Sequence, residues 1–168
     1  MHIIIQSSIH TLNKSKTLLT SLTDDVLSDH SVSPYYSCIG SHIRHIVDFY
    51  DCILSGLAEK KVDLIDRKRD EKMHRDCNYA MRHVDRVLQE LTMINEQAIN
   101  DVICVTDDLG LGKIDIPYTL GALFAQANSH AIHHYAIINY IVDRLGVSIE
   151  DDTFGYNPTT PKQDANLN

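Results

Sequence analysis

The sequence predicts an all-α protein, a four-helix bundle with a small β-hairpin between its third and fourth helices. Apolar residues recur at steps of three and four over four long segments, as the buried face of an amphipathic helix requires. Two short β-rich runs around a glycine-containing turn interrupt this pattern once, which is typical of a hairpin. The chain has 168 residues, 43% of them hydrophobic, which suits one domain with a substantial core.

The first two helices are expected over residues 5–27 and 37–59. A polar loop that contains Pro34 separates them, because proline and short polar residues disfavour helix continuation. The first apolar stripe consists of Ile5, Ile9, Leu12, Leu19, Leu22 and Val26. The second consists of Ile39, Ile43, Ile46, Phe49, Ile53 and Leu57.

The third helix is expected over residues 66–98, with charged residues opposite its apolar stripe. That stripe consists of Cys77, Ala80, Met81, Val84, Val87, Leu88, Leu91 and Ile94. Residues 102–106 and 113–117 then form the predicted hairpin, with Pro117 at its edge.

The fourth helix is expected between Thr119, a favourable N-cap, and Gly146, a favourable C-cap. Residues 148–168 contain Pro158, Pro161 and many polar side chains. We therefore expect a bundle over residues 1–147 and an irregular C-terminal tail over 148–168.

The net charge of −8 argues against a nucleic-acid partner, which normally requires a concentrated basic face. The basic run from Arg67 to Arg69 is flanked by Asp66 and Asp70, so we interpret it as a solvated helix start. Recognition of an anionic small molecule is the alternative.

The chain shows no apolar run of the roughly 20 residues that a membrane helix needs, and its opening residues lack the basic region of a signal peptide. A cytoplasmic protein without a membrane partner is therefore expected. The four cysteines include no Cys-x-x-Cys pair, and we expect free thiols. Cys38 and Cys52 are expected in the core.

The strongest functional signal is a pair of histidines, His130 and His134, in the apolar stripe of the fourth helix. Residues at i and i+4 lie one turn apart on the same face, so both imidazoles can point at one ion. Burial among apolar side chains is costly unless each imidazole has a partner. A metal ion or hydrogen bonding within the core would supply that partner. A third ligand would come from another helix, and the second helix offers His42 and His45.

The segments 40–48 (GSHIRHIVD) and 129–135 (SHAIHHY) resemble the DinB-like (YfiT-type) superfamily of metal-binding four-helix bundles. Partial similarity extends to a subgroup's pattern at residues 66–70 and 154–158. The resemblance implies a metal triad made by His45, His130 and His134. It also implies one divalent ion, zinc, nickel or iron, which imidazole ligands accept.

Three protein ligands leave open positions, as in catalytic zinc sites. Members of the superfamily include transferases and isomerases that use low-molecular-weight thiols, so the resemblance implies a thiol cosubstrate and a transferase-like or hydrolase-like reaction. The candidate supporting residues are His42, Arg44, Asp48 and Tyr135. We expect a homo-oligomer. The alternative function is that of a non-catalytic oligomeric bundle with a structural metal or none.

Overall fold

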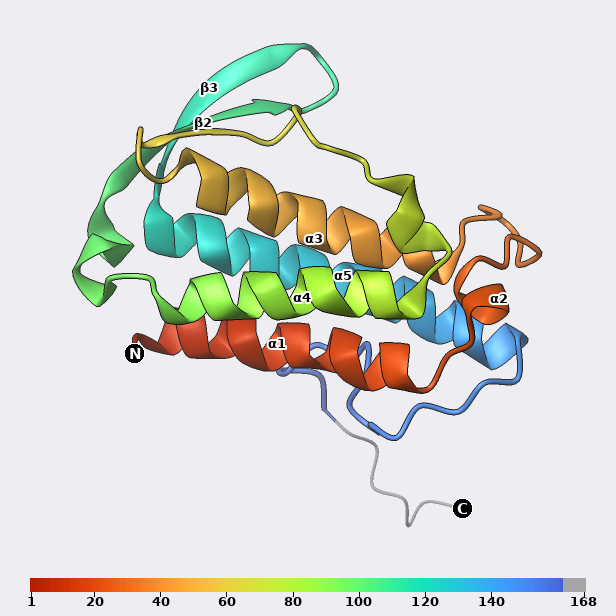
Figure 1. The fold of residues 1–168 in the computed structure, drawn as a ribbon. Helices are drawn as coiled ribbons and strands as arrows, with labels where there is room; N and C mark the ends of the chain where they lie inside the picture. The colour runs from red at the N-terminus through yellow and green to blue at the C-terminus, as the bar shows by residue number, and fades with distance from the viewer. Residues whose placement is uncertain (162–168) are drawn as a thin grey trace.

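The computed structural model describes residues 1–161. Its four long helices are α1 (Ile3–Thr20), α3 (Ile39–Gly56), α4 (Cys77–Thr92) and α5 (Leu120–Arg144). They lie side by side around one core (Figure 1). The predicted apolar stripes supply most of that core, so the four-helix bundle is confirmed.

The first helix is shorter than expected. It ends at Thr20, and a separate four-residue helix, α2 (Asp24–Leu27), follows. The hydroxyl of Thr23 accepts a hydrogen bond from the backbone N–H of Val26 and caps this second helix. A side chain that caps a new helix requires extended backbone at its own position, which explains why the expected continuous helix over 5–27 is wrong.

The third helix was predicted too long at both ends. Residues 66–76 hold only a short 3₁₀ turn, η1 (Glu71–His74), because Asp70 and Asp76 each accept a hydrogen bond from a backbone N–H that follows them. Such local bonds compete with helix. A second 3₁₀ turn, η2 (Glu96–Asn100), follows α4.

The predicted hairpin is confirmed as β2 (Val102–Asp108) and β3 (Lys113–Thr119). An unpredicted strand, β1 (Lys61–Asp63), pairs in parallel with β2 and completes a three-stranded sheet of order β1-β2-β3. Three residues give too short a pattern to identify a strand. Strands β2 and β3 of this sheet lie over the C-terminal half of α3 (Figure 1). A side chain at Gly56 would clash with the carbonyl oxygen of Lys61, so glycine permits this close approach.

The described part of the tail contains turns and no helix or strand after α5, and the expectation for residues 162–168 lies outside the described residues. Phe154 is buried, and Lys14 forms an ion pair with Asp151 at 3.2 Å. The tail therefore packs on the bundle. No helix among the described residues is long and apolar enough to cross a membrane.

Candidate metal centre

Three histidines from two helices converge at the seam between α3 and α5. Their candidate ligand atoms, one each from His45, His130 and His134, all lie within 4.8 Å of one another. The Nε2 atoms of His130 and His134 are 3.2 Å apart. The ring centroids of His45 lie 4.8 Å from His130 and 4.7 Å from His134. The structure thus brings together the three residues that the sequence motifs indicated, in an arrangement that could hold a metal ion.

The positions of these side chains follow from the helix geometry. His130 and His134 stand one turn apart on α5, and the buried Ala131 lies between them. The ring of Phe49, one turn after His45 on α3, contacts His130 in a tilted arrangement, with the ring centroids 5.0 Å apart. This aromatic contact holds the His130 ring and covers one side of the site. The sequence analysis had placed Phe49 only in the core.

Burial keeps the imidazoles of the site neutral. Burial, and after it the neighbouring His130 and His45, lower the pKa of His134 to about 2. Burial and then the charge of Arg67 lower the pKa of His45 to about 3. The same two causes lower the pKa of His130. A neutral imidazole keeps a free lone pair, which metal coordination requires.

A hydrogen-bonded relay supports His134 from outside the triad. Its Nδ1 atom lies 2.8 Å from Nδ1 of His42, and the Nε2 atom of His42 lies 2.8 Å from Oγ of Ser37. If Nε2 of His134 keeps its lone pair for a metal ion, its Nδ1–H must donate to Nδ1 of His42, and the Nε2–H of His42 must then donate to Ser37. A second hydrogen bond of this kind fixes the tautomer and the ring orientation of a metal ligand. His42 therefore lies where a supporting residue is expected.

Replacing His42 with alanine is expected to weaken metal affinity about 10- to 100-fold, because the bond that orients His134 is lost. Competition with a chromophoric zinc chelator would measure the change. His10→Ala, which removes an exposed histidine of α1, is the matched control. Unchanged affinity in the His42 variant would contradict a supporting role. Complete loss of the site there but not in His45→Ala would make His42 the ligand.

Arg67 reaches the triad, contrary to its interpretation as part of a solvated helix start. It is half-buried in the loop between β1 and η1. Its Nη1 atom lies 2.9 Å from Nδ1 and 3.4 Å from Nε2 of His45, and its Nε–H donates to the carbonyl of Leu64 at 2.7 Å. Sequence spacing carries no signal for this contact, because it depends on how the loop folds back.

Arg44 and Asp48 form a network beside the triad. The Arg44 Nη1–H donates to Oδ2 of Asp48 at 2.9 Å, and its Nε–H donates to Nε2 of His74 at 2.8 Å. Burial raises the pKa of Asp48, and the positive charge of Arg44 opposes that shift. The backbone N–H of Arg69 also lowers the pKa of Asp48. Through His74, Arg44 connects α3 to η1, which follows the loop that carries Arg67.

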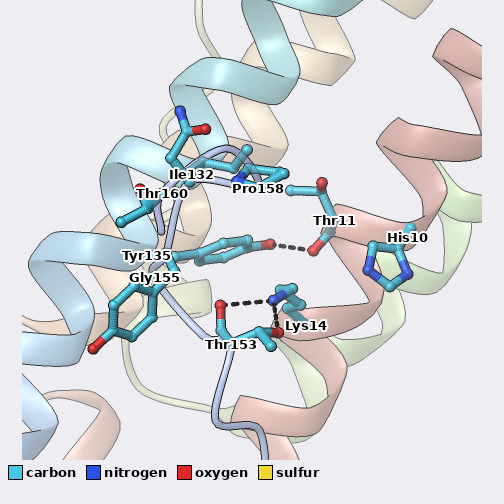
Figure 2. Close-up of a pocket in the computed structure, with 11 residues that line it drawn as sticks. His10, Thr11, Lys14, Ile132, Tyr135, Thr153, Gly155, Pro158 and Thr160 are labelled. Atoms are coloured by element: carbon cyan, nitrogen blue, oxygen red, sulfur yellow. Dashed lines mark hydrogen bonds between the residues drawn. The ribbon is translucent and has the colours of Figure 1, made fainter. Parts of the chain in front are cut away.

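Tyr135 does not join this site, although the sequence analysis named it as a pocket candidate. It is buried between α5 and α1, where its hydroxyl donates to the carbonyl of Thr11 at 3.1 Å (Figure 2). The same hydroxyl lies 2.6 Å from Oγ of Ser15. Tyr135 lines a cavity of about 290 Å³ between α1, α5 and the tail. One position along a helix turns a side chain by about 100°, so Tyr135 and His134 face different neighbours.

Three histidine ligands would leave coordination positions of a bound metal ion open for water or a substrate. Among residues 1–161, no Cys, Asp or Glu joins the cluster as a fourth candidate ligand. None of the three imidazoles is exposed, yet His45 and His130 are only partly buried. Three neutral nitrogen ligands of this kind suit zinc, nickel or iron.

The fold and the triad together define a helical bundle with a candidate histidine metal site. A family model described as the DinB superfamily matches residues 10–138, and the chain belongs to that superfamily. A DinB-like protein from Bacillus cereus has a similar solved structure, with a TM-score of 0.61 and 19% sequence identity. The match covers 88% of this chain and 94% of that one, and at this identity it shows the shared fold. The search of curated proteins finds no match.

Proposed function

We propose that this protein is a metal-dependent enzyme whose site, made by His45, His130 and His134, acts with a low-molecular-weight thiol. The observation that carries the proposal is the convergence of three neutral imidazoles without a fourth candidate ligand among the described residues. Structural metal sites usually have four protein ligands, whereas catalytic sites keep a position open. The resemblance to thiol-dependent members of the superfamily supports the choice of cosubstrate.

The protein's residues would hold the ion and orient its ligands. His130 and His134 would bind from one rigid helix and His45 from another, with His42 fixing the tautomer of His134. A divalent ion in this position supplies Lewis acidity, which lowers the pKa of a thiol or water bound beside the triad. Phe49 would exclude water from one side.

The raised pKa values of two cysteines of the protein favour a nucleophile that comes from outside the chain. Burial raises the pKa of Cys52 to about 11, and burial together with Asp24 raises that of Cys77 to about 12. Cys38 is buried at the start of α3, where its sulfur accepts a hydrogen bond from the N–H of Ser41. The thiolate is the nucleophilic form, and Cys52 and Cys77 stay protonated near neutral pH. A small thiol would supply the nucleophile.

The first test is the metal content of protein purified without an affinity tag or chelator, measured by plasma mass spectrometry. A three-ligand site is expected to hold about one equivalent of zinc, nickel or iron. Calorimetric titration of the loaded protein with a small thiol would then test the cosubstrate. No metal, even after incubation with zinc and nickel, would refute the proposal and favour the non-catalytic bundle.

A further inference from the structure

We infer that Arg67 is the anion-binding residue of this site and that the small molecule which meets the triad carries a carboxylate. The inference rests on the proposed function, because it assigns a substrate class to the same site. It depends on the contact between Arg67 and His45, on the charges around the triad and on the loop that holds Arg67 in place.

Neutral His45 offers a single ring lone pair, which either Arg67 or a metal ion can use. A neutral imidazole has one ring nitrogen that accepts and one that donates. Arg67 now uses that single acceptor, since its Nη1–H points at Nδ1 from 2.9 Å. When His45 serves as a metal ligand, its lone pair is given to the ion, and the other nitrogen carries a proton. Arg67 then loses its acceptor, whichever nitrogen binds the metal.

No carboxylate of residues 1–161 forms an ion pair with Arg67. The buried Asp48 is paired with Arg44, and the charge of Arg67 acts on it only as a smaller effect that lowers its pKa. Asp107 on β2 is close enough to His130 to raise its pKa in part, but it forms no ion pair with Arg67. A divalent ion on three neutral ligands beside a half-buried guanidinium leaves an excess of positive charge, which an anion would offset.

The loop that follows β1 holds Arg67 in a fixed position. Asp63 accepts hydrogen bonds from the N–H groups of Ile65 and Asp66, at 2.8 and 3.1 Å, and turns the chain after β1. The carbonyl of Leu64 accepts the Nε–H of Arg67. With Nε held and Nη1 released from His45, the guanidinium keeps N–H groups for a ligand.

These features select a carboxylate over a neutral group. A guanidinium is a planar fork whose N–H groups match the two oxygens of a carboxylate, and it is always charged. The Nη1 atom of Arg67 is already within hydrogen-bond distance of a triad ring. The expected ligand is therefore compact, with its carboxylate only a few bonds from the atom that meets the metal.

The test uses the full-length protein loaded with Co²⁺, whose visible absorption reports ligand exchange at the ion. We would titrate it with 3-mercaptopropionate, with the uncharged 2-mercaptoethanol and with propionate, after measuring cobalt content. The wild type is expected to bind 3-mercaptopropionate about 10- to 100-fold more tightly than 2-mercaptoethanol, as a hydrogen-bonded charge predicts. Arg67→Gln is expected to remove most of this preference, and Arg67→Lys to keep part of it. Lys68→Gln, which removes an exposed charge from the same loop, should keep all of it.

The outcomes separate this inference from the proposed function. Equal binding of both thiols by the wild type would overturn the role of Arg67 and leave the thiol proposal intact. Failure of both thiols, together with propionate binding that Arg67→Gln abolishes, would refute the thiol and support Arg67. Absence of binding by all three ligands would overturn both. If Arg67→Gln does not retain cobalt, the affinities of the wild type for 3-mercaptopropionate and 2-mercaptoethanol still test whether the site prefers a carboxylate.

Discussion

Replacing His134 with alanine is expected to weaken metal binding by more than about a hundredfold, because loss of a ligand exceeds loss of the residue that supports it. Nε2 of His134 faces Nε2 of His130, and its Nδ1 faces His42, so one substitution removes both the ligand and the end of the relay. Titration of purified variants with zinc, followed by metal analysis after gel filtration, would measure the effect.

The matched control is His133→Ala, which changes the neighbouring residue of the same helix. His133 is exposed and is not part of the three-histidine cluster, although its ring centroid lies 5.4 Å from that of His134. Its removal is expected to leave affinity nearly unchanged. Equal losses in the two variants would mean that α5 tolerates neither change and that the assignment of ligands is wrong.

The metal-free protein is expected to lose stability steeply as the pH falls below about 6.5. The pKa values of His42, His45 and His134 fall from the ordinary 6.5 to about 4, 3 and 2. Above pH 6.5 these rings are neutral in both folded and unfolded chains, so stability is complete. Below it only the unfolded chain gains protons, which costs about 1.4 kcal/mol per pH unit for each ring. The stability contributed by each ring stops decreasing once the pH falls below the pKa of that ring in the folded protein.

The expected loss between pH 6.5 and 5 is roughly 2 to 4 kcal/mol for the three rings together, after a reduction for the solvent around partly buried groups. Urea unfolding with a chelator present, at about pH 7.5 and pH 5, would measure it. Replacing His134 with asparagine should reduce the slope of the free energy of unfolding against pH by the equivalent of about one proton. A midpoint that does not change with pH would show that these rings titrate normally.

The sequence predicted the fold because helix periodicity extends over many residues. The stripe from Cys77 to Leu91 is buried in α4 as expected, and Thr119 caps α5. The errors lie where a few side-chain bonds override the pattern. Thr23 and Asp76 each begin a new helix by capping it, and β1 owes its existence to pairing with β2, which is distant in sequence.

The three histidines of the candidate metal site were accessible from the sequence, whereas their surroundings were not. His130 and His134 are paired by helix spacing alone, and the motif similarity selected His45. The roles of Arg67 and Tyr135 were misjudged for one physical reason. A side chain's partner on another element depends on the path of loops and on packing angles, which neither spacing nor composition encodes.

The buried hydroxyl of Tyr135 also bears on the metal centre. Its hydrogen bonds to Ser15 and Thr11 of α1 fix the rotation of α5 about its own axis. A small rotation would break these bonds and swing His130 and His134 away from His45. The direction in which His130 and His134 point from one face of α5 is thus fixed by hydrogen bonds that Tyr135 makes to α1 from another face of the same helix.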